Sequence, residues 1–461
     1  MVEAWANSLD FHLDVPGTRV RAGLEAALRE AVTSGRLPPG IRLPPTRSLA
    51  ADLGIARNTV ADAYSQLVAE GWLSARTGAG TWVTHHPAPA PALAPPAVPE
   101  TRQPRYDLRP GVPDLAAFPR PAWLAAARRA LSAAPARVLG YPDPRGLPEL
   151  REALAVYLAR ARGVAASPGR ILVCAGFSHG LALLCQVLAA RGARVLAAES
   201  YGHEAHRRLA AGAGLRLQPL PVDSGGARVD SLAGADACLL TPAHQFPLGM
   251  TLQPQRRRRV ISWAAGSGAL VIEDDYDGEF RFDRQPVGAM QALAPEHVAY
   301  AGTASKSLAP GLRLGWLVLP ASLMDEMVAA KESAGAACST LDELTLAEFI
   351  TSGGYDRQVR LARLSYRRRR DRLAAALRQQ APRVRVTGIA AGLHALAELP
   401  AGWQEAEVTG RAAARGLVVE GLASYRVAED GHGPALVVGY GRPAAHAFTS
   451  ALARLCAVLA Q

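Results

Sequence analysis

The stretch GTASKSLAPGLRLG, from Gly302 to Gly315, is the part of the sequence around which the rest is organised. It contains Lys306, one of only two lysines in the chain; the other is Lys331, and the remaining Lys/Arg positions are all arginine. Arginine cannot lose its proton or form an imine, whereas a lysine of lowered pKa can. A lysine kept between two serines and ahead of a glycine-containing turn therefore indicates a need for a primary amine. The competing interpretation is a surface lysine left over from a compositional drift.

The totals describe a globular protein with more than one domain. The 461 residues are 49% hydrophobic and 20% charged, which is enough for two or three domains with sizeable cores. The chain lacks a run of about 18 apolar residues, so no membrane helix is expected. Residues 1–15 carry three acids and lack the pattern of a signal peptide. The five cysteines have no zinc or disulfide spacing, which fits a reducing, cytoplasmic location.

Residues 1–84 carry the pattern of a winged helix-turn-helix. Apolar residues at helical spacing predict helices over 17–35, 46–53 and 57–70, with Thr46 as the N-cap of the second, and a short hairpin over 72–83. In this motif the N-terminal end of the last helix enters the major groove of DNA. The alternative is a small helical domain that packs on the rest of the chain.

Charge alone does not locate a DNA-binding surface. The formal net charge is +11, yet residues 1–84 hold eight arginines and eight acids. Residues 36–59 hold four arginines against one acid, and this local excess suits phosphates and base edges. The predicted DNA contacts are Arg47, Arg57, Asn58, Thr59 and Gly80. The runs LPPTRSLA (43–50), IARNTV (55–60) and GAGT (78–81) resemble the DNA-binding domain of GntR-family bacterial repressors.

Residues 85–105 are rich in Pro and Ala and are predicted to form a semi-stiff linker. From 106 to 461, helical stretches alternate with short apolar strands, predicted over 170–174, 194–198, 237–241, 269–273, 298–301 and 314–319. This alternation indicates an α/β domain with a mostly parallel sheet, in which ligands bind beyond the carboxyl ends of the strands. A smaller α+β subdomain with a long helix over 353–379 is expected after residue 327.

Three polar clusters follow these strands. The turn CAGFSHG (174–180) could set backbone N–H groups against an anion at a helix N-terminus. The run EDDYDGEF (273–280) offers a carboxylate for a pyridinium nitrogen and a tyrosine for a ring hydroxyl, or alternatively oxygen ligands for a metal cation. The third cluster adds the amine of Lys306. Beside it, the hydroxyls of Thr303 and Ser305 and the guanidinium of Arg313 could bind a phosphate. Pyridoxal phosphate (PLP) needs an imine lysine, a partner for its ring nitrogen and an anion site.

The region over about residues 106–461 resembles the fold-type I aminotransferases, and within them the MocR-type branch of GntR regulators. The resemblance rests on TPAHQFPLG (241–249), EDDYDGEF (273–280) and GTASKSLAPGLR (302–313). It implies that Lys306 forms the Schiff base with PLP, that Asp274 pairs with the pyridine nitrogen and Tyr276 with the ring hydroxyl. It further implies that Tyr201 stacks on the ring. The remaining implied contacts are Gly176, Phe177, Ser178, Thr303, Ser305 and Arg313 with the phosphate, His244 or Gln245 near the ring hydroxyl, and Tyr141 across a dimer interface.

The chain departs from the family pattern in places. The phosphate turn reads FSH (177–179) where the family usually has Ser or Thr and then Gln, and the segment before Tyr201 is shorter than usual. Where some members carry an effector-binding arginine, this chain has Ser424. Arg426 and Arg442 are therefore the candidate effector contacts, and no metal ligand is predicted.

These observations favour a DNA-binding transcriptional regulator over an enzyme. The resemblance implies a head-to-tail homodimer that binds a double-stranded operator and senses PLP, or an amine or amino acid that reacts with it. One alternative is a PLP-dependent aminotransferase that carries a DNA-binding domain, and another is a regulator whose cofactor site is vestigial. We prefer the regulator because a complete winged helix serves no purpose in metabolism alone, although slow transamination is compatible with it.

Overall fold

The computed structural model describes residues 20–76, 78–84, 104–282, 287–428 and 431–460. The chain divides into two compact units, Met1–Arg102 and Gln103–Gln461. The division falls at the end of the Pro- and Ala-rich segment, and the predicted linker over 85–105 lies outside the described residues except for its last two positions.

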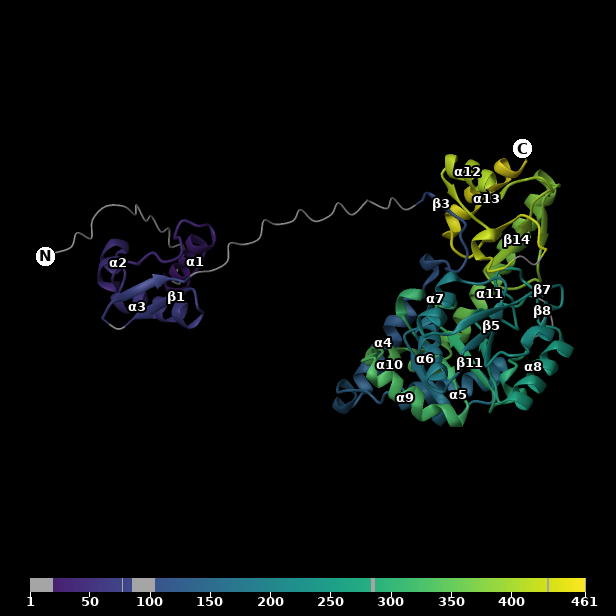
Figure 1. Ribbon diagram of the computed structural model, residues 1–461. Coiled ribbons are helices and arrows are strands. Elements are labelled where there is room, and N and C mark those ends of the chain that lie inside the picture. Colours follow the sequence, from purple (N-terminus) through teal and green to yellow (C-terminus); the bar gives the residue numbers. More distant parts are fainter. Residues whose placement is uncertain (1–19, 77, 85–103, 283–286, 429–430, 461) are drawn as a thin grey trace. The chain divides into compact units, whose positions relative to one another are not determined.

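The N-terminal unit consists of helices packed beside one hairpin (Figure 1). Its elements are α1 (Val20–Thr33), α2 (Thr46–Leu53), α3 (Arg57–Ala69), β1 (Leu73–Arg76) and β2 (Gly80–Val83). Apolar side chains at helical spacing, including Leu28, Leu49 and Leu67, meet in one core. Gly54, in the left-handed conformation, ends α2 shortly before α3 begins, and β1 pairs antiparallel with β2. The predicted winged helix-turn-helix is confirmed.

The start of α2 differs from the prediction. Pro45 is the N-cap, with φ −54° and ψ 145°, and no side chain caps the helix. Thr46 is instead the first helical residue. The physical reason is that proline already holds its own φ near the value that leads into a helix, so the chain enters α2 directly after Pro45.

The centre of the second unit is a seven-stranded sheet with the strand order β4-β12-β11-β10-β9-β5-β6. The strands are β4 (Ile171–Cys174), β5 (Val195–Glu199), β6 (Arg216–Leu220), β9 (Ala237–Leu240), β10 (Leu270–Asp274), β11 (Val298–Thr303) and β12 (Gly315–Val318). β12 runs antiparallel to β11 and β4, and the other neighbours are parallel. This confirms the mostly parallel sheet. The sequence analysis missed the edge strand β6, because polar Arg216 and Gln218 interrupt its apolar pattern.

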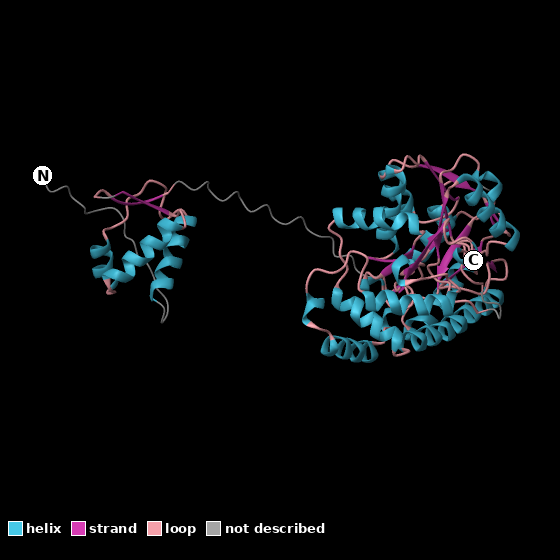
Figure 2. Ribbon diagram, turned by 90° about the horizontal axis from the view of Figure 1, so that it is seen from below, coloured by secondary structure: helices cyan, strands magenta, loops and turns pink. Residues whose placement is uncertain are grey.

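Helices cover both faces of this sheet (Figures 1 and 2). Along β4, Ile171 and Val173 belong to a core shared with α5 (Pro148–Arg162) and α11 (Gly354–Gln380). Leu172 and Cys174 belong to a second core, shared with α6 (Phe177–Ala190) and α9 (Met324–Ser333). The other helices around the sheet are α4 (Arg120–Ala133), α7 (Glu204–Gly212), α8 (Pro254–Ser267) and α10 (Thr340–Thr351). Burial of alternate residues on opposite faces explains why these strands read as continuous apolar runs.

A smaller α+β subdomain completes the unit, as predicted. Its antiparallel sheet has the order β13-β14-β17-β16. The elements are β13 (Arg385–Thr387), β14 (His394–Glu398), α12 (Glu405–Ala414), β16 (Glu420–Gly421), β17 (Ala435–Gly439) and α13 (Ala445–Leu459). Two short pairs remain, β3 (Tyr106–Asp107) with β15 (Leu417–Val418), and β7 (Val222–Asp223) with β8 (Gly226–Ala227). Within the described ranges, every helix is too short or too polar to cross a membrane.

A buried ion pair ties α5 to the loop that follows β10. Arg162 Nε and Nη2 donate to the two carboxylate oxygens of Asp275 at 2.6 and 3.0 Å, and both side chains are almost fully buried. The Tyr300 hydroxyl donates to the same carboxylate at 2.8 Å, and Arg162 Nη1 donates to the carbonyl of Gly278 at 3.0 Å. The loop that begins after Asp274 is therefore held against α5 by this buried, hydrogen-bonded ion pair.

Removing the guanidinium should destabilise the second unit. We expect Arg162→Met to lower its free energy of unfolding by about 3–5 kcal/mol, because Asp275 would remain buried without its partner. Urea unfolding followed by tryptophan fluorescence measures the change. The double variant Arg162→Met/Asp275→Asn is the control and should recover part of the loss, since it removes the unpaired charge. Equal stability of Arg162→Met and the unaltered protein would contradict this assignment.

Candidate functional site

A cavity of about 340 Å³ opens where the parallel strands β5, β10 and β11 end. The predicted cofactor residues that line it are Gly176, Phe177, Ser178, Tyr201, Asp274, Tyr276, Thr303, Ser305, Lys306 and Arg313. Most of them follow the carboxyl ends of parallel strands. Arg313 precedes β12 instead, and it reaches the same edge because β12 runs in the opposite direction.

Lys306 lies in the turn after β11, with its amine held inside the protein. Its Nζ donates a hydrogen bond to the carbonyl oxygen of Gly111, 2.6 Å away. Burial lowers the pKa of this amine, while the carboxylates of Asp274 and Asp277 oppose that shift. A lowered pKa increases the fraction of unprotonated amine near neutral pH. Lys306 is therefore able to attack a carbonyl carbon.

Asp274, at the end of β10, has an unused hydrogen-bond acceptor. Its Oδ1 is buried and has no partner among the described residues. Burial raises the pKa of this carboxyl well above its usual range; Lys306 opposes the shift, and Asp275 and Asp277 add to it. Buried polar atoms are normally hydrogen-bonded, so this oxygen needs a donor from the cavity. The protonated ring nitrogen of PLP is such a donor, and Asp274 fits that role.

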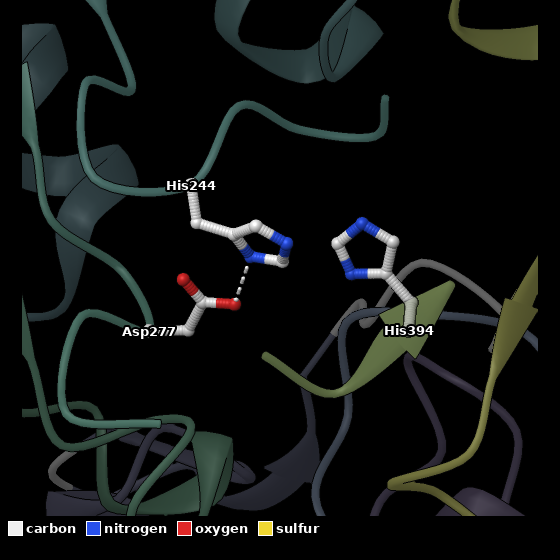
Figure 3. Close-up of side chains that lie close together, drawn as sticks. All are labelled: His244, Asp277 and His394. Atoms are coloured by element: carbon white, nitrogen blue, oxygen red, sulfur yellow. Dashed lines mark hydrogen bonds and ion pairs between the residues drawn. The ribbon is translucent and has the colours of Figure 1, made fainter. Parts of the chain in front are cut away.

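Three buried side chains, His244, Asp277 and His394, lie close together (Figure 3). They contact Tyr276 through His244. His244 Nδ1 lies 2.8 Å from an Asp277 carboxylate oxygen and 3.1 Å from the Tyr276 hydroxyl. His394 Nε2 lies 3.2 Å from the carbonyl oxygen of Pro247. Burial lowers the pKa of His394 well below its usual value, and His244 adds to the shift. His394 is therefore neutral, and the group holds Tyr276 through His244.

The same three side chains have the donor types of a metal site. Their potential ligand atoms lie within 4.8 Å of one another. Zinc binds imidazole nitrogen and carboxylate oxygen at about 2.0–2.2 Å, so three ligands would have to close around one ion. In the structure each side chain is already within hydrogen-bond distance of a protein group. We therefore assign the group to orienting the Tyr276 hydroxyl, whose pKa burial raises well above its usual range.

A candidate anion site lies where the β4–α6 turn meets the turn before β12. Gly176 is the N-cap of α6 at φ 84°, so the first N–H groups of the helix face the cavity edge. An added Cβ at Gly176 would lie 3.5 Å from Arg313 Nη1. Arg313 forms no hydrogen bond or ion pair through its guanidinium within the described part of the chain. The Thr303 and Ser305 hydroxyls lie 2.8 Å apart beside it. A free guanidinium, two hydroxyls and a helix N-terminus suit a phosphate.

Two further predicted cofactor contacts, Gln245 and Tyr201, make contacts with other protein groups. Gln245 does not line the cavity; its amide donates to the carbonyl of Phe246 at 2.7 Å and accepts from the N–H of Leu248 at 3.0 Å. It therefore holds its own loop in shape. Tyr201 does line the cavity, but its side chain is only 2% exposed and its ring meets His432 edge-on at 5.5 Å. Its stacking role stays a prediction.

The remaining predicted contacts lie outside the cavity lining. Tyr141 is fully exposed. Arg442 donates to Asp107 at 2.7 Å, so part of its charge is already paired within the protein. Arg426 is exposed and shares a β-bridge with Tyr201. The structure brings neither arginine into the cavity, and their effector roles stay predictions.

The sequence analysis missed Glu199, His203 and His206, which all line the cavity. Thr241 donates to a Glu199 carboxylate oxygen at 2.5 Å, and burial raises the pKa of Glu199 to about 7. Burial lowers the pKa of His203 to about 4 and that of His206 to about 3, so both rings are neutral at pH 7. Glu199 ends β5, so the strand-end rule could have found it. The two histidines could not be predicted, because nothing in the sequence shows that the start of α7 lies at the cavity.

Four of the five predicted DNA contacts of the first unit lie at helix starts, and the fifth, Gly80, begins β2. Arg47 follows the first residue of α2, and Arg57 and Asn58 begin α3; all three are exposed, and Thr59 is half-buried. Gly80 has φ 125°, and an added Cβ would lie 2.5 Å from the Arg42 guanidinium. The glycine is therefore needed for the shape of the hairpin. The cationic start of α3 suits insertion into a major groove.

The raised pKa of Glu199 predicts a pH-dependent stability. A carboxyl with a raised pKa in the folded state contributes stability below its unfolded pKa and loses it as the pH rises through about 7. We expect Glu199→Gln, which mimics the protonated form, to exceed the unaltered protein in free energy of unfolding by about 1–3 kcal/mol at pH 8. The difference should be small at pH 5. Parallel pH profiles of the two proteins in urea unfolding would contradict this.

Solved structures similar to this chain are aminotransferases. An archaeal alanine:glyoxylate aminotransferase has a TM-score of 0.70 and 25% identity, covering 77% of this chain and 90% of that one. An α-aminoadipate aminotransferase from Thermus thermophilus, complexed with N-(5'-phosphopyridoxyl)-L-leucine, has a TM-score of 0.68 and 23% identity, covering 77% and 91%. The second unit therefore has the aminotransferase fold, whose members depend on PLP.

Family models match both units. Residues 21–83 match the bacterial regulatory proteins of the gntR family, and residues 107–428 match aminotransferase class I and II. The probable rhizopine catabolism regulatory protein MocR of Rhizobium meliloti is 34% identical over 393 residues, covering 80% of this chain and 79% of that protein. The pyridoxine biosynthesis transcriptional regulator PdxR of Corynebacterium glutamicum is 34% identical over 418 residues, covering 88% and 89%. The chain therefore belongs to the MocR-type branch of the GntR family of helix-turn-helix transcriptional regulators.

Proposed function

We propose that this regulator binds PLP at Lys306 and a double-stranded operator through the start of α3. Its signal is PLP itself, or an amine or amino acid that reacts with the carbonyl group held at Lys306. One observation carries the proposal: a single cavity joins an amine of lowered pKa, the unpartnered Oδ1 of Asp274 and the unpaired guanidinium of Arg313. These groups match the aldehyde, the ring nitrogen and the phosphate of PLP.

Different side chains would bind different parts of the cofactor. PLP supplies an aldehyde carbon that accepts an amine and a ring that withdraws electrons. Asp274 accepts a hydrogen bond from the ring nitrogen and keeps it protonated. Tyr276, held by His244, donates to the ring oxygen. Arg313, with the hydroxyls of the β11 turn and the start of α6, binds the phosphate.

We further propose a homodimer, with the DNA-binding domain at 1–84, the linker at 85–105 and the effector domain at 106–461. Tyr141 supports this arrangement, because a fully exposed tyrosine on a hydrogen-bonded loop suits a partner subunit. Its role would be to reach the phosphate of the partner's cofactor. Arg426 and Arg442 remain the candidate contacts for an effector carboxylate.

Residual transamination is a second candidate activity. The observation in its favour is Lys306, since a buried amine of lowered pKa can accept and return protons at a substrate carbon. Exchange of amino groups between an amino acid and a keto acid, assayed with the PLP-loaded protein, distinguishes an enzyme from a sensor. Slow exchange fits a regulator, whereas rapid turnover would favour the aminotransferase.

Lys306→Ala should abolish covalent cofactor binding. The unaltered protein should gain a visible imine band with PLP, and borohydride reduction should attach the cofactor to the peptide containing Lys306. The variant should show neither, because alanine has no nucleophile. Absorbance and peptide mass spectrometry measure the two effects. Asp274→Asn is the control and should keep the adduct, since it retains the amine. An unmodified, colourless wild type would overturn the cofactor assignment.

Arg57→Ala should weaken operator binding without affecting the cofactor site. We expect the affinity to fall by about 1–3 kcal/mol if Arg57 reads a base, or the salt slope to fall by about 1 if it contacts phosphate. Fluorescence anisotropy at several salt concentrations, with an operator selected from genomic fragments, measures both. Arg21→Ala, an exposed arginine of α1 paired with Glu25, is the matched control. Equal effects of the two variants would contradict the placement of α3 on DNA.

A further inference from the structure

The second lysine of the chain, Lys331, is also buried, although it does not line the cofactor cavity. It lies on α9 and is 3% exposed. Its Nζ donates to the carbonyl oxygen of Pro144 at 2.5 Å and to that of Val173 at 2.7 Å. Both contacts are to neutral carbonyls rather than carboxylates. A buried ammonium group without a direct carboxylate partner is costly, so its position must serve other groups.

One of the two carbonyls belongs to the strand that leads into the phosphate end of the proposed site, and the other belongs to a loop that is hydrogen-bonded to this strand. Val173 lies in β4, which ends at Cys174 and leads into the turn at Gly176. Pro144 lies in the loop between Tyr141 and Gly146. The N–H of Val173 also donates to the carbonyl of Arg145 at 2.8 Å, so loop and strand are joined on both sides of Lys331.

The same loop is held by further buried charges. Glu343 accepts a hydrogen bond from the N–H of Leu147 at 2.6 Å, and Arg151 Nε donates to the carbonyl of Gly146 at 2.9 Å. Gly146 has φ 97°, and an added Cβ would lie 2.5 Å from a methyl group of Val173. This packing leaves little room for a planar guanidinium, whereas an ammonium group is compact and directs its donors tetrahedrally. That accounts for a lysine in a chain that otherwise uses arginine.

The charge of Lys331 acts on the beginning of α6. His179, in the first turn of that helix, accepts a hydrogen bond from the N–H of Ala175 at 3.0 Å through Nδ1. Burial lowers the pKa of His179, and the charges of Lys331 and Arg313 both add to the shift. His179, at the start of α6, is therefore within electrostatic range of both Lys331 and Arg313.

We propose that Lys331 is a positioning residue for the phosphate end of the cofactor site. It fixes the β4–α6 turn against the loop that carries Tyr141, and it places a second positive charge behind the anion site lined by Gly176 and Arg313. The ligand it favours is an aldehyde that carries a phosphate, over the same aldehyde without one. This inference rests on the proposed PLP binding.

The test compares two aldehydes, pyridoxal 5'-phosphate and pyridoxal, on the full-length protein. Imine absorbance titrations should show that Lys331→Met weakens the affinity for the phosphorylated aldehyde roughly tenfold, because two carbonyls and the turn lose their donor. The affinity for pyridoxal should change by less than about threefold, because that ligand makes no phosphate contact. Lys331→Arg keeps the charge but cannot place its planar guanidinium between the two carbonyls, so it should also lose affinity for the phosphorylated aldehyde, although less than Lys331→Met. Arg170→Met is the matched control: its guanidinium also donates to a backbone carbonyl, that of Leu319, beside the opposite end of β4. It should alter neither affinity.

A second readout needs no imine. Inorganic phosphate should raise the melting temperature of the unaltered protein and of Arg170→Met, and raise that of Lys331→Met less. Equal losses for both aldehydes would show a general structural role and overturn the proposal, as would unchanged binding of both. If the unaltered protein binds neither aldehyde, the proposed cofactor fails, and the response to phosphate still decides the role of Lys331. If Lys331→Met does not fold, the comparison of Lys331→Arg with Arg170→Met decides it.

Discussion

The close approach of Gly176 and Gly315 is the constraint on which the site depends. β12 is inserted antiparallel between β4 and β11, so its first residue meets the ends of its neighbours. A Cβ on Gly315 would lie 2.9 Å from the Cα of Gly176. Arg313 takes a left-handed φ of 52° just before this crossing, which costs energy for a residue with a side chain. This conformation directs the Arg313 guanidinium toward the start of α6, where a Cβ on Gly176 would lie 3.5 Å from Nη1.

Carboxylates packed around the cavity set its electrostatics. Burial raises the pKa of both Glu199 and Asp274, and the charge of Glu199 adds to the shift of Asp274. Asp275 is paired with Arg162, whereas Asp274 lines the cavity and has no ion-pair partner among the residues that the structure describes. With the PLP binding proposed above, such a site would stabilise a cationic ring nitrogen and resist a second anion near it. The phosphate would lie at the other end, where Arg313 and the α6 N-terminus supply positive charge.

The unusual use of lysine has a separate physical explanation at each position. The chain meets its need for exposed and ion-paired cations with arginine, which binds carboxylates through two hydrogen bonds. At Lys306 only a primary amine can react with a carbonyl carbon. At Lys331 a compact ammonium group donates to two backbone carbonyls. Lys306 lines the cavity, whereas Lys331 is buried on α9 against the strand β4.

From the sequence alone followed the two domain types, the positions along the chain of six of the seven strands of the central sheet, and the polar residues beyond their ends. That Lys306, Asp274, Tyr276 and Arg313 line one cavity could be predicted, because local motifs at strand ends place side chains at one edge of a parallel sheet. Tertiary structure decided which partners those segments meet. Gln245 turns to its own loop, Arg442 pairs with Asp107, Glu199 and His203 enter the cavity, and Lys331 is buried. These outcomes depend on contacts between segments far apart in the chain, and hydrophobic periodicity reports only which face of a local element is buried.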